Sequence, residues 1–219
     1  MNILIPNKIT PDLAEETGWH IGDGSMNIYG SKGFYQLRGH IEDDKQHYIT
    51  RIAPIFKKLY GLKLNLREMP STRVFGFQVW NNELIEFKQK MGLPLGKKFD
   101  ISIPKIFLKE KELKLSVLRG IFDTDGSINL EKKNNKLYPR IYISTICPTL
   151  ACQLFNLFNE AGLRTTKYSE IYNKKFKRQR NYRITMRGEK MLHSFMQIIK
   201  PKNPKHLLKY TQFLNSKSL

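Results

Sequence analysis

One segment near the N-terminus recurs, in altered form, just past the middle of the chain. The first copy covers residues 13–25 (LAEETGWHIGDGS) and the second covers residues 115–127 (LSVLRGIFDTDGS). Every matched position is offset by 102 residues, as from Asp23 to Asp125. Because the two copies split the chain nearly at its middle, we infer a duplicated structural unit.

Each copy has the pattern of a helix that ends in a glycine-containing turn and leads into a strand. The first helix should begin with Thr10 as N-cap and Pro11 as its first residue, and the second should begin between residues 110 and 114. After each copy come two alternating polar and apolar runs, an amphipathic helix, two more strands and a closing helix. The amphipathic helices should end at Gly61 and Gly162. The pattern is therefore α-β-β-α-β-β-α, twice.

This reading predicts an α+β protein of two pseudo-symmetric αββαββα halves. We expect a first half at 1–92, a connector at 93–109, a second half at 110–200 and a tail helix within 201–219. The halves should pack through the two repeated helices, each with a four-stranded antiparallel sheet on its side. The third strand of the first half should cover residues 62–67, where leucine alternates with polar residues. Pro54 lies inside a predicted helix and should kink it or end it early.

Charge and hydrophobicity narrow the class of partner. The chain carries 38 Lys and Arg against 19 Asp and Glu, a net charge of +19, while 40% of its residues are hydrophobic. Such a folded, basic protein suits a polyanion, either nucleic acid or an anionic membrane. No apolar run approaches the roughly 20 residues that span a bilayer, and the apolar N-terminal stretch is too short for a secretory signal. We therefore expect an intracellular protein without a membrane partner.

Two cysteines, Cys147 and Cys152, form neither a disulfide framework nor a paired zinc motif, and the five histidines are scattered. Small residues, by contrast, recur every four positions in each copy. They are Ala14, Gly18 and Gly22 in the first copy and Ser116, Gly120 and Thr124 in the second. Each helix therefore has a smooth stripe along one face, and two such faces can approach closely.

If these faces pack across a pseudo-twofold axis, the helix ends meet and bring Asp23 and Asp125 together. Two carboxylates there would repel each other at the negative ends of two helix dipoles. Hard cations such as Mg²⁺, which prefer oxygen ligands, would relieve that repulsion. A single Asp-Gly turn is usually only a turn, but two copies in matching contexts favour a metal site.

Both segments are similar to the LAGLIDADG motif, and the pair resembles the monomeric, two-motif form of that homing endonuclease family. The resemblance implies an intron-homing enzyme that binds a long, non-palindromic double-stranded DNA site and hydrolyses both strands with Mg²⁺ or Mn²⁺. In the family the last acidic residue of each motif binds metal, which implies Asp23 and Asp125. The carbonyls before them, at Gly22 and Thr124, would be secondary ligands. The earlier acidic position is Ile21 in the first copy and Asp123 in the second, and it is not assigned.

The resemblance also implies a basic residue beside each cleavage centre. By position these are Lys98 (or Lys97) and Lys202 (or Lys200), with simple phosphate contact as the open alternative. His40 and Ser144 end the second strand of each half; they either order water at the centre or face solvent. Trp19 and His20 should belong to the core, and we assign no role to Trp80.

On this fold the polar sheet faces would lie in the major groove, where side chains can distinguish all four base pairs. The basic loops 132–136 and 174–180 would contact phosphates, or be solvated. The predicted DNA-reading residues are Gln36, Arg38, Lys63, Asn65, Arg67 and Gln78 in the first half and Arg140, Tyr142, Arg164, Thr166 and Arg183 in the second.

Two other functions fit the same scaffold. One is an RNA maturase that assists the splicing of its own intron through the same basic surface. The other is a DNA-binding regulator without catalysis, although such proteins usually lose one or both of the acids that Asp23 and Asp125 supply.

Overall fold

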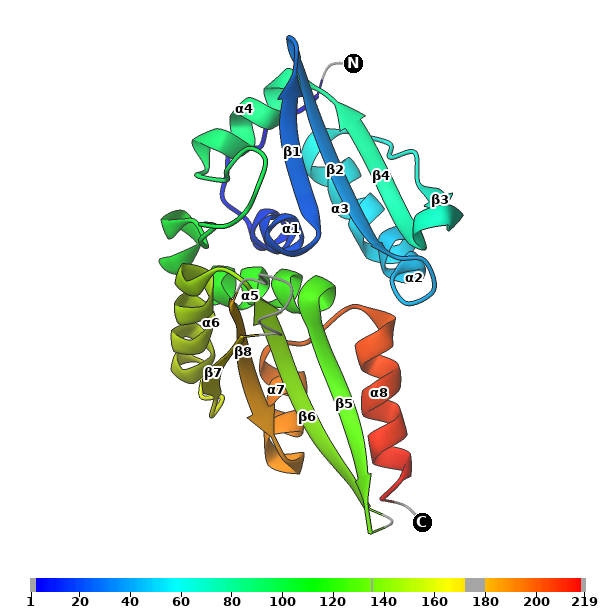
Figure 1. Ribbon diagram of the computed structural model, residues 1–219. Helices are drawn as coiled ribbons and strands as arrows, with labels where there is room; N and C mark the ends of the chain where they lie inside the picture. Colours follow the sequence, from blue (N-terminus) through cyan, green and yellow to red (C-terminus); the bar gives the residue numbers. More distant parts are fainter. Residues whose placement is uncertain (1–2, 135, 172–179, 218–219) are drawn as a thin grey trace.

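The computed structural model of the chain describes residues 3–134, 136–171 and 180–217. Two halves lie one above the other and meet through α1 (Pro11–Gly22) and α5 (Lys111–Asp125), as Figure 1 shows. Of the two predicted phosphate-binding loops, residues 135 and 174–179 lie outside the described part of the chain. The fold therefore places the two repeated segments at the centre of the molecule.

The first half contains an antiparallel sheet with strand order β1-β2-β4-β3. Its helices cover one face of this sheet, and α1 lies below the sheet in Figure 1. In chain order its elements after α1 are β1 (Gly24–Tyr29), β2 (Lys32–His40), α2 (Lys45–His47), a π-helical turn (Tyr48–Ile52), α3 (Ala53–Tyr60), β3 (Arg67–Met69), a 3-10 turn (Pro70–Thr72), β4 (Val74–Trp80) and α4 (Asn82–Lys90).

The second half repeats this arrangement, with strand order β5-β6-β8-β7. A 3-10 turn (Lys105–Leu108) precedes α5, and a final helix, α8 (Pro204–Asn215), lies beside the edge strand β5 (Figure 1). The predicted α+β class with two αββαββα halves is confirmed. The remaining elements are β5 (Gly126–Lys133), β6 (Lys136–Thr145), α6 (Pro148–Glu160), β7 (Thr166–Ile171), β8 (Arg180–Arg187) and α7 (Glu189–Ile198).

The start of α1 follows from local sequence chemistry. The Thr10 hydroxyl accepts a hydrogen bond from the Leu13 amide at 3.2 Å, and Pro11 is the first helical residue, as predicted. The helix ends at Gly22, and β1 begins two residues later. This short connection fixes Asp23 at the junction between helix and sheet.

The interface between α1 and α5 depends on small residues. A Cβ added to Gly18 would lie 2.4 Å from the Val117 carbonyl oxygen and 2.8 Å from the Gly120 Cα. A Cβ added to Gly120 would lie 2.1 Å from the Glu15 carbonyl oxygen. Since real Cβ atoms do not approach backbone this closely, both positions need glycine. The predicted close approach of the two helices is confirmed.

Two local expectations need correction or refinement. Residues 62–66 are not a strand, because β3 is only three residues long and pairs with β4 only from Arg67 to Met69. The alternation there instead comes from Leu62, which is buried, and from Leu64 and Leu66, which pack against the core. Pro54 does not end its helix early: it lies in the first turn of α3, directly after the π-helical turn, which absorbs the lost hydrogen bond.

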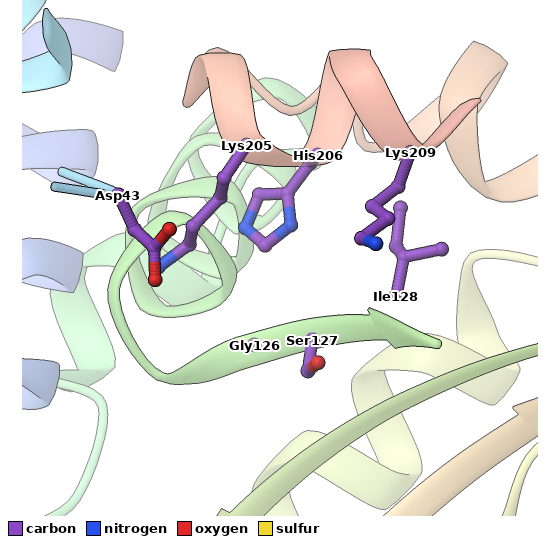
Figure 2. Close-up of a pocket in the computed structure, with 7 residues that line it drawn as sticks. All are labelled: Asp43, Gly126, Ser127, Ile128, Lys205, His206 and Lys209. Carbon is purple, nitrogen blue, oxygen red and sulfur yellow. The ribbon is translucent and has the colours of Figure 1, made fainter. Parts of the chain in front are cut away.

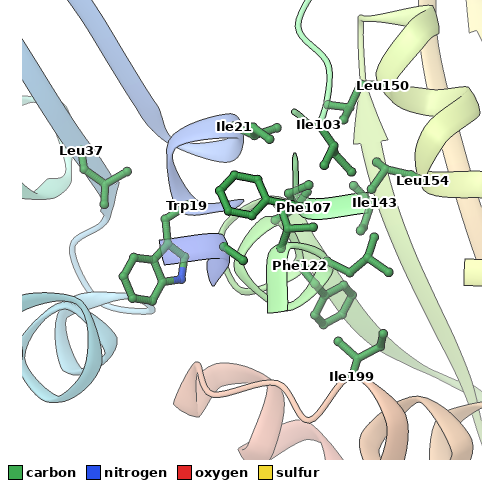
Figure 3. Close-up of a cluster of buried hydrophobic side chains, with 14 of the residues drawn as sticks. Trp19, Ile21, Leu37, Ile103, Phe107, Phe122, Ile143, Leu150, Leu154 and Ile199 are labelled. Atoms are coloured by element: carbon green, nitrogen blue, oxygen red, sulfur yellow. The ribbon is translucent and has the colours of Figure 1, made fainter. Parts of the chain in front are cut away.

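The buried core runs through the interface and into both halves. Figure 3 shows this cluster extending from Trp19 and Ile21 of α1, past Phe107 of the 3-10 turn, to Phe122 of α5. Trp19 and His20 are fully buried, as expected. Among the described residues, no helix combines the length and apolar character that a bilayer crossing needs. The boundaries at 92, 109 and 200 stay a prediction.

Candidate metal centre and nucleic-acid interface

Asp23 and Asp125 stand at equivalent ends of the two interface helices. Asp23 is the C-cap of α1 and Asp125 is the last residue of α5. A Cβ added to Gly22 would lie 3.3 Å from the Asp125 carboxyl carbon, so that carboxyl lies against the backbone that leads into Asp23. The structure therefore brings the two aspartates together, although each belongs to a different half.

The electrostatics of the pair show the cost of this proximity. Burial, the charge of Asp125 and the charge of Asp44 raise the pKa of Asp23 from 3.8 to about 8. Burial also raises the pKa of Asp125 to about 6, against the opposing effect of the nearby Lys98 and Lys205 ammonium groups. Asp125 nevertheless has solvent-exposed surface and Asp23 is half-buried, so both remain accessible from outside. The nearby lysines therefore offset the effects of burial and of the neighbouring carboxylates only in part.

Lys98 lies at the end of α1. Its ammonium group donates hydrogen bonds to the carbonyls of His20 at 3.2 Å, Ile21 at 2.9 Å and Gly22. Burial lowers the pKa of Lys98, and the charges of Asp125 and Asp23 oppose that shift. The predicted position of Lys98 beside the aspartate pair therefore agrees with the geometry. Its neighbour Lys97 lies over the Phe99 ring, with its ammonium 5.5 Å from the ring centre.

In the second half the corresponding position belongs to Lys205 and not to Lys202. The Lys205 ammonium lies 3.4 Å from the Thr124 carbonyl, and Thr124 is the repeat counterpart of Gly22. Lys202 is exposed, and its backbone amide, not its side chain, binds the Asp123 carboxyl at 3.0 Å. Sequence reasoning missed Lys205 because it counted from the closing helix without allowing for the turn that precedes α8.

A buried network fixes the tail segment beside the centre. Asp44 is 5% exposed and accepts hydrogen bonds from Asn203 Nδ2 at 2.7 Å and Lys205 Nζ at 2.8 Å. Asp123 accepts from the Asn203 amide at 3.1 Å, and burial raises the pKa of Asp123 to about 7. Asp44 therefore joins the first half to the C-terminal tail. No sequence motif marked Asp44.

The donor set at the helix ends suits a hard divalent cation. The carboxylates of Asp23 and Asp125 lie at these helix ends, together with the carbonyl oxygens of Gly22 and Thr124. Carboxylate, carbonyl and water oxygens are the ligands that Mg²⁺ accepts. Within the described residues no group of three or more His, Cys, Asp or Glu side chains could hold a metal ion. Asp23 and Asp125 would therefore supply only part of the ligands of a bound ion, and other oxygen atoms would supply most of them.

Cavities open beside both lysines. One cavity is lined by Gly22, Lys98, Asp125 and Ser144 among others, so it lies beside Asp125 and the end of α1. The other lies between α8 and β5 and is lined by Lys205, His206 and Lys209 of the helix and by Ser127 and Ile128 of the strand; Figure 2 shows Lys205 extending toward Asp43. Ser144 is therefore the predicted water-ordering residue that lines the aspartate cavity. His40 contributes a backbone amide to Asp44 at 2.7 Å.

On the sheet of the first half, the predicted reading residues share one face. Gln36, Arg38 and His40 alternate along β2 with the buried Tyr35, Leu37 and Gly39. Gln36 opposes Gln78 and donates to the Ser25 hydroxyl at 2.8 Å. Arg67 opposes Gly76 and hydrogen-bonds Gln78. Lys63 and Asn65 are exposed but precede β3, so they are not held by the sheet.

The second sheet carries a comparable polar face. Arg183 donates to the Ser144 hydroxyl at 3.3 Å, and its guanidinium lies 5.0 Å from the centre of the Tyr142 ring. Arg140 pairs with Glu131 at 2.9 Å, which reduces its free positive charge. Thr166 opposes Thr185 and is exposed, whereas Arg164 is exposed but precedes β7. The structure therefore gathers Arg140, Tyr142, Ser144 and Arg183 on one face.

Comparison of this chain with known proteins identifies related sequences. Residues 112–200 match the family model described as a LAGLIDADG-like domain. In Methanocaldococcus jannaschii, the replication factor C small subunit is 27% identical over 204 residues, which cover 88% of this chain and 10% of that protein. The glutamine–fructose-6-phosphate aminotransferase of the same organism is 26% identical over 133 residues, which cover 60% of this chain and 11% of that protein. The chain thus spans about a tenth of the length of these curated relatives.

Solved structures share the fold over most of the chain. The homing endonuclease I-DmoI in complex with DNA and Mn superimposes with a TM-score of 0.57 at 16% identity, covering 86% of this chain and 96% of that one. The LAGLIDADG homing endonuclease I-GzeII in complex with its DNA target superimposes with a TM-score of 0.58 at 13% identity, covering 96% of this chain and 92% of that one. The resemblance to the single-chain, two-motif LAGLIDADG form is therefore confirmed.

Proposed function

Since this chain has the fold of the single-chain LAGLIDADG homing endonucleases, we propose that it is a site-specific DNA endonuclease. It binds a long, non-palindromic double-stranded site in the major groove and hydrolyses both strands with divalent metal ions. The observation that carries the proposal is the convergence of Asp23, Asp125, Lys98 and Lys205 at the junction of the two halves. A scaffold that only binds DNA has no need to hold two carboxylates where they repel each other.

Asp23 and Asp125 would hold Mg²⁺ or Mn²⁺ between the helix ends, with the Gly22 and Thr124 carbonyls as secondary ligands. The bound metal would supply Lewis-acid stabilisation of the attacking and leaving oxygens. Lys98 and Lys205 hold positive charge next to the scissile phosphate, where negative charge grows in the transition state. Because each lysine lies at the end of a different helix, each would stabilise the transition state for cleavage of one DNA strand.

The sheets supply recognition. Gln36, Arg38 and Gln78 on one sheet and Arg140, Tyr142 and Arg183 on the other project polar groups from half-buried positions on one face of each sheet. Amide and guanidinium groups in such places can pair with adenine and guanine edges. The two faces differ in almost every residue, which supports a target without symmetry. Both motifs lie in one chain, which supports action as a monomer.

A randomised duplex library tests this proposal. The protein is incubated with the library and Mg²⁺, and the cut ends are sequenced. We expect double-strand cuts at one long site, which disappear in Asp23→Asn and Asp125→Asn while binding persists. Tight binding without a cut by the unaltered protein would instead identify a silent regulator. Selective binding to folded intron RNA, with no preference for any duplex DNA, would identify a maturase.

A further inference from the structure

Three aromatic side chains form a cluster at the outer end of the first sheet. The Phe34 and Trp80 ring centres lie 4.7 Å apart, and Tyr29 lies 5.7 Å from Phe34 and 6.1 Å from Trp80. Tyr29 is 56% exposed and Trp80 is 55% exposed. Aromatic rings that pack on one another and still face water in this way mark a contact surface more often than a core.

The cluster lies on the same face of the sheet as the predicted base-reading residues. Side chains alternate along a strand, so Phe34 shares its face with Gln36, two residues further on. Trp80 opposes Phe34 across the ladder, just as Gln78 opposes Gln36. Tyr29 shares the face of Ser25, which binds Gln36. The polar face therefore continues without a break into the aromatic cluster.

The distance from the metal centre can be estimated from strand geometry. β1 begins beside Asp23, and Tyr29 lies six residues further along the chain. At about 3.3 Å per residue, the cluster lies about 20 Å from the centre along the strand. Base pairs rise about 3.4 Å, so this distance corresponds to about six base pairs. In Figure 1 these strand ends are the ones furthest from α1 and α5.

We propose that Tyr29, Phe34 and Trp80 form an apolar reading patch for the C5-methyl groups of pyrimidines at the outer flank of the first half-site. This inference rests on the proposed function. Apolar groups in the major groove recognise the methyl group of thymine, which uracil and cytosine lack. The cluster carries no charge, and the Tyr29 hydroxyl accepts a hydrogen bond from the Asn27 side-chain amide at 3.4 Å. Methyl recognition is therefore the chemistry that it can offer.

The first test uses the unaltered protein. Duplexes are selected from a random library in the presence of Ca²⁺, and the bound site is resynthesised with single replacements. We expect thymine to be preferred about six base pairs from the centre, on the side bound by the first half. Replacing each such thymine with deoxyuridine should weaken binding about fourfold, the effect of one buried methyl group. Cytosine should bind as weakly as deoxyuridine, and 5-methylcytosine should recover part of the loss.

The second test removes the patch. Phe34→Ser combined with Trp80→Ser should abolish the thymine preference and the deoxyuridine effect at that flank, while preferences in the other half-site persist. Ile49→Ala is the matched control, because Ile49 is 44% exposed on the π-helical turn and lies outside the sheet. If the double substitution only lowers the melting temperature and the deoxyuridine effect remains, the cluster is structural and the inference is wrong.

A failure of this inference can be told apart from a failure of the proposed function. A protein that selects and cuts one site, with no methyl dependence at the flank, overturns the inference alone. A protein that selects no duplex at all overturns the proposed function together with it.

Discussion

Lys98 and Lys205 contact the same position of the repeat in the two halves. The Lys98 ammonium donates to the carbonyl of Gly22, and the Lys205 ammonium lies 3.4 Å from the carbonyl of Thr124. The two lysines come from unlike places, one from the segment between α4 and the 3-10 turn before α5 and one from the first turn of α8. The pseudo-symmetry of the centre is thus maintained by residues outside the repeated motif.

Replacing either lysine should impair cleavage of one strand. Lys98→Met or Lys205→Met removes a positive charge that is needed mainly in the transition state, so the rate at the affected strand should fall about 10²- to 10³-fold. Nicked DNA should then accumulate. A supercoiled plasmid that carries the selected site, sampled over time, separates nicked from linear product.

Lys202→Met is the matched control, since Lys202 is exposed and its side chain is not part of the centre. Its effect should be limited to a small loss of affinity at low salt. Equal rates for Lys202→Met and Lys205→Met would contradict the assignment of Lys205.

The stability of the protein should depend on pH through the aspartate pair. The folded-state pKa of Asp23 is about 8 and that of Asp125 is about 6, both above the ordinary value of 3.8. From about pH 4 to pH 8 the unfolded chain binds fewer protons at these sites, so their contribution to stability is greatest at low pH and is lost as the pH rises. Thermal unfolding of the unaltered protein and of Asp23→Asn should therefore diverge above about pH 4, with the variant more stable, and the difference should be complete near pH 8.

Divalent cations should reverse this loss, because they bind the deprotonated carboxylates. At a concentration about 100-fold above the dissociation constant, Mg²⁺ should add about 2.7 kcal/mol, or about 5–10 °C in melting temperature. The shift should be larger near pH 8 than near pH 5. Mg²⁺ shifts of the same size in Asp23→Asn/Asp125→Asn would argue against the metal site.

The helix interface should not tolerate one methyl group. In Gly18→Ala the new Cβ would meet backbone atoms of α5 at 2.4–2.8 Å, so the halves must separate. We expect a loss of at least about 3 kcal/mol, at the upper end of overpacking effects. Ser116→Ala lies in the same interface and removes only a hydroxyl, and it should change stability by less than about 1 kcal/mol. Urea unfolding measures both, and similar midpoints would disprove the tight fit.

The buried ion pair of the first half should be sensitive to the loss of one partner. Lys88 and Glu16 are fully buried and lie 2.5 Å apart, and Tyr60 also donates to Glu16 at 3.0 Å. Lys88→Met leaves an uncompensated carboxylate and should cost about 3–5 kcal/mol. Lys88→Met with Glu16→Gln should recover part of that cost. A double variant as unstable as the sum of both single changes would show that the two residues are not coupled.

Much of the architecture could be predicted because its signals are local. The Thr10 cap, the Pro11 start and the four-residue spacing of Gly18 and Gly22 depend on neighbours along one helix. Because the motif recurs around Asp125, the helix, turn and strand predicted for the first copy were also predicted for the second. Alternation placed Gln36 and Arg38 on one face without knowledge of the partner strand.

These local signals gave wrong predictions where the structure depends on contacts with a distant segment. Residues 62–66 alternate as a strand would, but they do not pair with β4, although β4 extends past Gly76, the partner of Arg67. The alternation instead buries Leu62 and packs Leu64 and Leu66 against the core. Likewise, position in the chain suggested Lys202, whereas the turn before α8 delivers Lys205 to the centre.

The sequence by itself determined the repeat, the helix ends and the two aspartates, since these depend on spacing along one segment. Only the tertiary structure decided which lysine stands beside them, that Asp44 and Asn203 fix the tail, and that three aromatic rings continue the polar face. These relationships join residues far apart in the chain, and such contacts depend on how helices and sheets pack, which the spacing of residues along a single segment does not specify.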